Sequence, residues 1–399
     1  MSFSDLFPKK TGNFSIFHSA PEPLAQLPYD QEIALKNQVL SAFLKSASLP
    51  AAQKVVPAPM SRHYRSTSKR RVTVKGAKVF LHMGRIPGKE MVAASLLEPE
   101  DHLQIYHFLQ EQFSIPRHRT AAAAANYCII RGGGRERALI LNVRHLSGDL
   151  IRSMRAIADA VQRAFPQVKS AFLYVDETGS DYYLEAERPV GKPGWKKLFG
   201  PERLALQIPA PVQQKFLYSP TAFSQINESV LPSFAAVLEE NLQICPEDQL
   251  LDLYCGYGLW SLLLAPKAGN IWGAELSTDA VKDARSNAAY HYPEKNLHFE
   301  AGSLNGEFLR RNAPPSAGKN EVILLDPPRH GALSGVLEHV IGRRPRRIAH
   351  VFCGVDEVPG TLQIYKANHC KIETIIPFDF FPGTLNLEIL VILTPPPKK

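Results

Sequence analysis

Four features of this 399-residue chain could take part in one reaction: the glycine loop Leu251–Gly258, the motif Asp326-Pro-Pro-Arg329, the isolated Cys353, and Glu388. Glycines let a backbone approach a nucleotide-type cofactor closely. Paired prolines set a rigid, extended backbone that can frame a flat ring. A thiolate is a soft nucleophile, and a carboxylate can remove a proton. Together these groups fit methyl transfer to carbon 5 of a pyrimidine.

The glycine loop follows a predicted strand and opens a predicted helix, Trp260–Ala265. Glu275 ends the next predicted strand roughly 20 residues further on, where an acid can bind ribose hydroxyls. Nicotinamide cofactors and a plain strand–helix turn are the competing interpretations. The dinucleotide fingerprint, however, has a third glycine where this chain has Ser261, whereas a methyltransferase loop needs only Gly256 and Gly258.

Arg329 ends its motif with a fork of donors that suits carbonyl oxygens or phosphate, which favours the edge of uracil. The alternative is that the motif Asp326–Arg329 only stabilises a loop. Cys353 ends the fifth predicted strand. A lone cysteine is usually an inert core residue, but its place at the carboxyl end of a strand favours a role in a site. Asp356 and Glu357 would raise the pKa of its thiol, so activation must come from elsewhere, such as Arg329.

Glu388 lies inside the last predicted strand, where a charged residue is unusual. An exposed edge position is the alternative to a role as a base. The remaining cysteines are interpreted as structural: Cys128, Cys245, Cys255 and Cys370. Five widely spaced cysteines without a CxxC pair argue against a disulfide framework and against a zinc or iron–sulfur site.

From about residue 216, short apolar strands alternate with helices: Gln249–Leu253, Ile271–Glu275, Leu297–Glu300, Glu321–Leu325, Arg347–Phe352, Lys371–Pro377 and Leu387–Leu393. This pattern predicts a doubly wound α/β sheet over residues 216–399. The link Phe378–Asn386 is too short for a crossover helix, so the last two strands should be antiparallel. The expected architecture is a Rossmann-like class I methyltransferase domain.

Residues 1–215 predict an α+β domain. Residues 1–28 should wrap loosely over the surface, and Asp30 should cap a helix that ends at Lys45. A further helix is predicted over Leu150–Phe165. Three hairpins are predicted: Val72–Val74 with Val79–Leu81, Tyr127–Arg131 with Ala138–Val143, and Ala171–Val175 with Tyr182–Ala186. Because no helix follows Gly132–Gly134, this triple glycine is better explained as a hairpin turn than as a phosphate loop.

The net charge of +8 and the pI of about 9.1 favour a polyanionic partner. The basic segment Arg62–Arg71 has Tyr64 among its charges, and we expect Arg65, Arg70 and Arg71 to contact RNA phosphates. A solvated loop is the alternative. Arg343–Arg347 should cap the start of the fifth strand, with a secondary phosphate site as the less favoured interpretation. Without an export signal or a long apolar run, we expect a soluble, cytoplasmic monomer.

Five motifs resemble the RNA (uracil-5-)-methyltransferase family: Phe223-Ser-Gln225-Ile-Asn227, the glycine loop, Asp326–Arg329, Cys353, and Phe381–Glu388. The resemblance implies an enzyme that uses S-adenosyl-L-methionine and a covalent bond between the cysteine and uracil C6. It implies that Cys353 is the nucleophile and that Glu388 removes the C5 proton. By position in the motifs it assigns cofactor contacts to Gln225, Tyr254, Glu275 and Asp326, and contacts with the target base to Phe223 and Arg329.

Three of the motifs depart from the family pattern. Phe352-Cys-Gly-Val355 replaces Ser-Cys-Asn-Pro, Asn386 replaces a histidine, and Leu259 replaces a small polar residue. The iron–sulfur motif and small barrel of the ribosomal branch are not recognised, which favours transfer RNA as substrate. Two rivals stay open. One is a carbon-5 cytosine methyltransferase, which Arg329 and the lack of a second cysteine after proline disfavour. The other is an RNA-binding or folding module that has lost turnover.

Overall fold

The computed structural model describes residues 2–18, 20–76, 78–83, 94–134, 136–177, 194–208 and 212–396. Its internal contacts divide the chain into two compact units. The first unit comprises Met1–Ser61, Ile208–Gln213 and Ser229–Lys399, and the second comprises Arg62–Gln207 and Gln214–Glu228. In the described part of the chain, no helix has the length and apolar character needed to cross a membrane.

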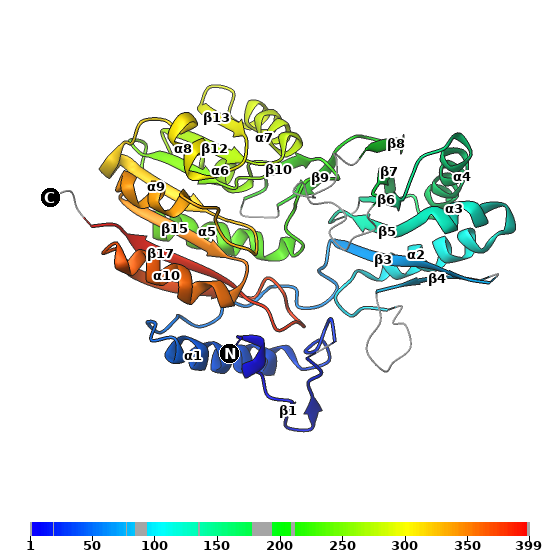
Figure 1. The fold of residues 1–399 in the computed structure, drawn as a ribbon, viewed down its shortest axis with the longest axis horizontal. Helices are drawn as coiled ribbons and strands as arrows, with labels where there is room; N and C mark the ends of the chain where they lie inside the picture. Colours follow the sequence, from blue (N-terminus) through cyan, green and yellow to red (C-terminus); the bar gives the residue numbers. More distant parts are fainter. Residues whose placement is uncertain are drawn as a thin grey trace. The chain divides into compact units, whose positions relative to one another are not determined.

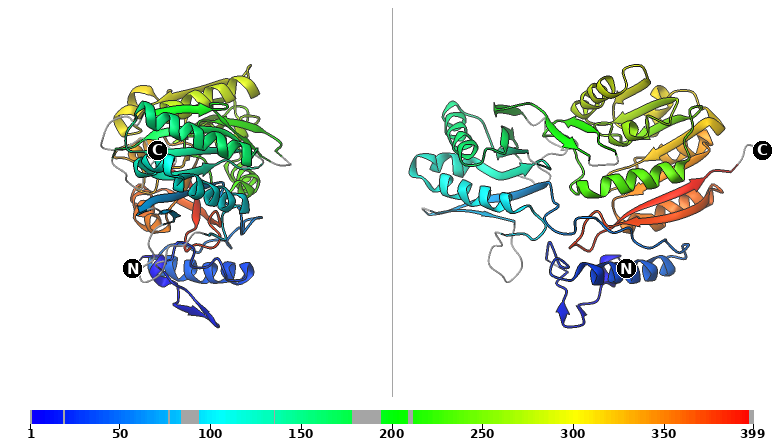
Figure 2. Two further views of the ribbon diagram at one scale, coloured as in Figure 1. Left: turned by 90° about the vertical axis from the view of Figure 1, so that its right-hand side faces the viewer. Right: turned by 180° about the vertical axis from the view of Figure 1, so that it is seen from behind.

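The first unit is built on a seven-stranded sheet, whose strands lie side by side in Figures 1 and 2. In spatial order they are β13 (Asn296–Ala301), β12 (Asn270–Glu275), β11 (Gln249–Leu253), β14 (Glu321–Leu325), β15 (Arg347–Phe352), β17 (Glu388–Thr394) and β16 (Lys371–Phe378). The first five run parallel, and β17 is antiparallel to both of its neighbours. This confirms the predicted α/β fold, including its antiparallel last pair.

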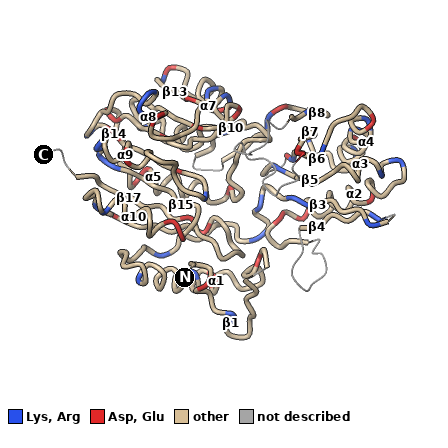
Figure 3. The backbone as a smooth tube through the Cα atoms, in the orientation of Figure 1, with Lys and Arg blue, Asp and Glu red and all other residues tan. Residues whose placement is uncertain are grey.

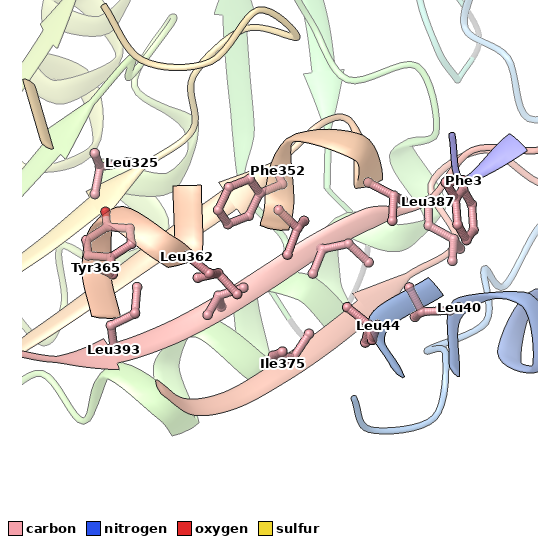
Figure 4. Close-up of a cluster of buried hydrophobic side chains, with 14 of the residues drawn as sticks. Phe3, Leu40, Leu44, Leu325, Phe352, Leu362, Tyr365, Ile375, Leu387 and Leu393 are labelled. Atoms are coloured by element: carbon pink, nitrogen blue, oxygen red, sulfur yellow. The ribbon is translucent and has the colours of Figure 1, made fainter. Parts of the chain in front are cut away.

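Helices cover both faces of this sheet, because its central strands are apolar on both sides. On one face, buried side chains from α1 (Tyr29–Ser46), α9 (Val336–Arg343) and α10 (Val358–Ala367) form one apolar cluster with the strands, part of which Figure 4 shows. Alternate residues of each strand point to the opposite face. The strands also contact α5 (Leu231–Leu242), α6 (Leu259–Leu264) and α7 (Thr278–His291), while α8 (Gly306–Asn312) packs beside α9.

The N-terminal segment belongs to this core, contrary to the prediction that residues 1–28 wrap loosely over the surface. Phe3, Phe7 and Leu27 are each only 3% exposed. Phe3 packs edge-on against the rings of Phe7 and Phe43, with centroids 5.4 and 5.7 Å apart. The segment also forms the short strands β1 (Lys10–Thr11) and β2 (Phe14–Ser15). These aromatic residues lack a helical or strand period, so the sequence pattern did not reveal their burial.

The compact units therefore differ from the predicted division into 1–215 and 216–399. The first 61 residues pack with the C-terminal sheet, and residues 214–228 belong to the second unit. Helix α1 begins at Tyr29, directly after Pro28, and no side chain caps it. The prediction that Asp30 caps this helix was wrong, because Asp30 lies within its first turn.

The second unit contains a six-stranded sheet in the order β4-β3-β5-β6-β7-β8. Its strands are β3 (Thr67–Lys75), β4 (Lys78–His82), β5 (Ala125–Arg131), β6 (Arg137–Val143), β7 (Val168–Val175) and β8 (Trp195–Phe199), with β9 (Leu204–Gln207) and β10 (Lys215–Tyr218) as a separate hairpin. Its helices are α2 (Glu100–Ser114), α3 (Arg119–Ala124) and α4 (Gly148–Ala164). The first two predicted hairpins are confirmed; the predicted strand Tyr182–Ala186 lies outside the described residues.

Candidate active site

The glycine loop joins β11 to α6 at the carboxyl edge of the sheet in the first unit. Its backbone is left-handed at Tyr254, Gly256 and Gly258, with φ of 69°, 55° and 83°. A Cβ added at Gly256 would meet no atom within 4 Å, so the space in front of this residue is open. A Cβ added at Gly258 would lie 3.2 Å from the Cβ of Ala284 in α7. Gly256 thus leaves room for a ligand, whereas Gly258 lets the loop pack on a helix.

Glu275 ends β12 beside this loop. Its carboxylate accepts hydrogen bonds from the backbone N–H groups of Gly256 at 3.2 Å and Ser277 at 2.9 Å. A carboxylate at this position can also accept hydrogen bonds from ligand hydroxyls. On the other side of the loop, the hydroxyl of Tyr254 accepts the N–H of Leu333 at 3.4 Å. The arrangement is compatible with the ribose site that the sequence predicted around Gly256 and Glu275.

Asp326 follows β14, which lies next to β11. One of its carboxylate oxygens accepts the indole N–H of Trp260 at 3.3 Å. The other accepts from Cys353 Sγ at 3.8 Å. Burial raises the pKa of Asp326 to about 6, although both hydrogen bonds oppose the rise. The sequence analysis missed Trp260, whose available signal was its place in the first turn after the glycine loop.

The pairing of β15 with β17 brings Cys353 and Glu388 together. The antiparallel register pairs Phe352 with Ile389. Glu388 is the first residue of β17, and Cys353 follows the last residue of β15, so both lie at the same end of this strand pair. The charge of Glu388 also acts on the Cys353 thiol. The predicted nucleophile and the predicted base are therefore neighbours at this edge of the sheet.

Burial raises the pKa of both the Cys353 thiol and the Glu388 carboxyl well above their ordinary values. The negative charges of Asp326 and Glu388 raise the pKa of the thiol further, and Arg329 lowers it. Arg329 also lowers the pKa of Glu388. Glu357 has a smaller effect on the thiol, in the predicted direction. A cation at Arg329 thus favours the ionised forms of both groups.

Asp356, which the sequence analysis expected to act on the thiol, accepts the backbone N–H of Phe3 at 2.6 Å. Arg329 itself is exposed, and its guanidinium lies 6.0 Å from the centroid of the Phe381 ring. Two of the sequence motifs therefore meet at this cation–π contact. It holds the guanidinium beside the edge of the sheet where Cys353 lies.

An aromatic cluster borders the same edge. Phe234 of α5 packs against Trp260, Phe378 and Phe380, with ring centroids 4.7, 4.8 and 5.4 Å away. Phe378 is also the cross-strand partner of Glu388 on β16. These rings exclude water, which is why the pKa values of the neighbouring acids rise.

The departures from the family pattern lie in two environments. Leu259 is buried at the start of α6, and the ring of Phe352 stacks on His350 with centroids 4.1 Å apart. Asn386 is exposed, and its backbone N–H donates to Thr384 Oγ1 at 3.2 Å. Leu259 and Phe352 thus pack into the interior, and Cys353 and Glu388 lie at the sheet edge.

Five predicted substrate or cofactor residues lie in the second unit: Phe223, Gln225, Arg65, Arg70 and Arg71. Phe223 is 70% exposed, whereas Gln225 is buried. Their segment is tied to β5 through Arg131, whose guanidinium donates to Ser224 Oγ at 2.7 Å. The exposed aromatic ring is free of the core and can contact a base. The roles of these residues stay predictions.

Arg70 requires a correction, because it is not a surface residue. Its side chain is completely buried and makes two hydrogen bonds with Glu98, at 2.8 and 2.6 Å. Its guanidinium also lies 4.5 Å from the ring centroid of Tyr106. Side chains alternate along β3, so Arg71 points to the opposite face and is exposed. The basic residues coloured along β3 in Figure 3 are therefore not equivalent, and Arg70 is unsuited to contact RNA.

The basic segment Arg343–Arg347 caps the start of β15, as predicted. Arg343 makes a two-point ion pair with Glu321, and Arg346 pairs with Asp248 at 2.5 Å. Both arginines are thus occupied by structural acids. Among the residues that the structure describes, no cluster of three or more His, Cys, Asp or Glu side chains could hold a metal ion.

The seven-stranded sheet, with its glycine loop and acidic residue at neighbouring carboxyl ends of strands, defines a class I methyltransferase domain. A solved structure shares this fold: Pyrococcus abyssi tRNA (uracil-54, C5)-methyltransferase, in complex with S-adenosyl-L-homocysteine, aligns with a TM-score of 0.71 and 16% identity, over 96% of this chain and 87% of that one. At this identity the likeness shows the fold alone. Within that class, residues 209–395 match the model of the tRNA (Uracil-5-)-methyltransferase family.

Curated relatives carry related names. An uncharacterised RNA methyltransferase of Oceanobacillus iheyensis is 30% identical over 230 residues, which cover 58% of this chain and 47% of the relative. Another from Staphylococcus aureus is 22% identical over 383 residues, 92% of this chain and 81% of the relative. The chain spans about half the length of several curated relatives that it matches.

Proposed function

We propose that this chain methylates carbon 5 of a uridine in RNA, with transfer RNA as the favoured substrate and S-adenosyl-L-methionine as the methyl donor. The observation that carries the proposal is that Cys353 and Glu388 lie at the same end of β15 and β17, within electrostatic reach of each other, of Asp326 and of Arg329. A nucleophile and a base on adjacent strands suit a reaction that needs attack and proton removal on one ring. The cofactor class agrees with the S-adenosyl-L-homocysteine in the Pyrococcus abyssi structure.

The open space at Gly256 and the carboxylate of Glu275 fit this cofactor. Gly256 would let the backbone approach it, and Glu275 would accept hydrogen bonds from its ribose. Tyr254 lies in the same loop and Asp326 follows the neighbouring strand β14, so both can contribute to this site. The motif around Gln225 implies a further cofactor contact for that residue. When bound, the cofactor supplies an electrophilic methyl group.

Attack begins with the Cys353 thiolate. Its proton can pass to Asp326, whose carboxylate already accepts the thiol at 3.8 Å, while the charge of Arg329 favours the thiolate. The sulfur forms a bond to C6 of uracil, and the electrons of the C5–C6 double bond move toward O4 as an enolate. Arg329 can stabilise this negative charge with its guanidinium donors. The enolate makes C5 nucleophilic, so C5 takes the methyl group.

Release requires the proton that remains on the methylated C5. Glu388 removes this proton, the C5–C6 double bond forms again, and the bond from C6 to sulfur breaks. Burial raises the pKa of Glu388, which makes its carboxylate a stronger base than a free glutamate. Cys353 leaves as a thiolate and is ready for another cycle.

RNA would be held by residues of the second unit. Arg65 and Arg71 can contact phosphates, and the exposed ring of Phe223 can stack on the target base or a neighbouring base. Because C5 and C6 must be reached from the face of the ring, the uridine has to leave its stack. A loop of a structured RNA allows this at low cost.

The test uses transfer RNA and ribosomal RNA transcripts labelled with tritium at C5 of uracil. The wild type should release tritium, Cys353→Ala should release none, and Glu388→Gln should stall as a covalent protein–RNA complex on a denaturing gel. Cys370→Ala, which changes a buried cysteine away from the site, is the matched control and should keep its activity. Tritium release by Cys353→Ala would overturn the mechanism. No release by the wild type from either RNA would favour the cytosine enzyme or the binding module.

A further inference from the structure

A network of buried charges joins α1 to the link between β16 and β17. The ammonium group of Lys36 donates to Asp379 Oδ1 at 2.8 Å and to the carbonyl oxygen of Phe381 at 3.3 Å. It also pairs with Glu32 at 2.8 Å, and the Tyr29 hydroxyl donates to Asp379 Oδ2 at 3.1 Å. Lys36, Glu32 and Asp379 are completely buried. Charged residues are seldom fully buried unless paired, and their hydrogen bonds have fixed directions.

The N-terminal segment holds the same link at further points. The N–H of Gly383 donates to Glu32 Oε1 at 2.6 Å, and its carbonyl accepts the N–H of Leu24 at 2.9 Å. At the start of the link, the N–H of Asp379 donates to the carbonyl of Val56 at 3.0 Å. The link between the two strands is therefore anchored near its start and its middle, by residues more than 300 positions earlier in the sequence.

This link ends at Glu388. The register of β16 and β17 pairs Phe378 with Glu388, so Asp379 is the first residue beyond the cross-strand partner of Glu388. The link also carries the ring of Phe381, over which the guanidinium of Arg329 lies at 6.0 Å. The charge network thus holds the backbone next to Phe378, the cross-strand partner of Glu388, and at Phe381, whose ring contacts Arg329.

We propose that Lys36 is a positioning residue for Glu388. Lys36 acts through Asp379 and the carbonyl of Phe381, and it touches neither RNA nor cofactor. The inference rests on the proposed function, which assigns Glu388 its role. Without Lys36 the link loosens, so proton removal from C5 slows more than attack by Cys353, which follows β15 outside the link. A displacement of about 1 Å at a reacting group can slow a step about 100-fold.

The test compares Lys36→Met with Arg343→Met in the full-length protein. Each change removes a buried cation from the first unit, but Arg343 lies at the amino end of β14, away from the link. Transfer RNA containing 5-fluorouracil traps the enzyme after attack, because fluorine cannot leave as a cation. Per folded protein, both variants should form this trapped complex in normal yield. With tritium-labelled uridine RNA, only Lys36→Met should release label at least tenfold more slowly and accumulate the covalent complex.

Because Lys36→Met leaves the buried carboxylates of Glu32 and Asp379 without their cation, this variant can fail to fold. In that case Tyr29→Phe tests the positioning role. It keeps every charge and removes only the hydroxyl that bridges Asp379 and the N–H of Ala58. It should slow tritium release about fivefold, in line with one hydrogen bond. Tyr365→Phe, which removes a buried hydroxyl bonded to His350, is its control and should release label normally.

The two levels of inference fail differently. If the wild type never becomes trapped on 5-fluorouracil RNA, the proposed function is wrong. Suppose instead that the wild type is trapped. If Lys36→Met then releases tritium as fast per folded protein as Arg343→Met, if Tyr29→Phe does so as fast as Tyr365→Phe, and if no covalent complex accumulates, the positioning role of Lys36 is wrong. If trapping and tritium release both fall in proportion to the fraction of unfolded protein, Lys36 contributes to stability alone.

Discussion

Substitution of Gly256 by alanine should lower the stability of the protein slightly through backbone strain, and should weaken cofactor binding much more strongly. Gly256 has a φ of 55°, and an added Cβ meets no atom within 4 Å. The change therefore costs only the left-handed backbone penalty, about 1 kcal/mol, because no protein atom has to move. In a unit of this size, that lowers the melting temperature by about 2–4 °C. The new methyl group, however, points into the space proposed for the cofactor.

Gly318 offers a matched control. It has a φ of 59°, and an added Cβ there also meets nothing within 4 Å, but it precedes β14 at the amino edge of the sheet. Gly318→Ala should therefore lose the same stability as Gly256→Ala. Calorimetry with S-adenosyl-L-homocysteine should show at least tenfold weaker binding, about 1.4 kcal/mol, for Gly256→Ala alone. Equal affinity in both variants and the wild type would refute the placement of the cofactor at Gly256.

Three further outcomes follow from the burial and charge of particular residues. Arg70→Ala should lower the free energy of unfolding by about 3–5 kcal/mol, since it leaves Glu98 buried without its partner. Arg71→Ala should change the free energy of unfolding by less than about 0.5 kcal/mol, yet reduce the salt slope of transfer RNA binding by about one. Urea unfolding and binding titrations that show a stability loss for Arg71→Ala and a binding loss for Arg70→Ala would refute these roles. Burial raises the pKa of Asp252 to about 7, so the folded protein retains a proton that the unfolded chain loses between about pH 4 and pH 7. The free energy of unfolding should therefore fall with rising pH across this window, by up to about 1.4 kcal/mol per pH unit, and Asp252→Asn should flatten the profile; an unchanged slope would contradict it. Because burial also raises the pKa of the Cys353 thiol, the initial rate of trapping on 5-fluorouracil RNA should still increase above about pH 8, and a plateau near neutral pH would show that the thiolate is already formed there.

The sequence by itself determined the sheet of the first unit and the motifs at its edge. The predicted bounds of β11, β14 and β15 agree with the structure, because a short apolar run that ends in glycine, proline or a charge is a local signal for a buried strand. The strand pattern placed Cys353 at the end of the fifth strand, one residue from its position directly after β15, and it placed Glu388 inside the last strand, of which Glu388 is the first residue. Local patterns suffice for such features, since strand formation and chain turning depend on neighbouring residues.

Only the tertiary structure decided which side chains meet. Arg70 and Arg71 are adjacent in the sequence, yet one pairs with Glu98 in the core and the other is exposed. The sequence could not show that Lys36 bonds to Asp379, because the two lie 343 positions apart and neither has a local pattern. A buried charge is stable only with a partner, and that partner is chosen by the packing of distant elements. The motifs therefore predict which groups are catalytic, whereas the positions of these groups depend on contacts that exist only after folding.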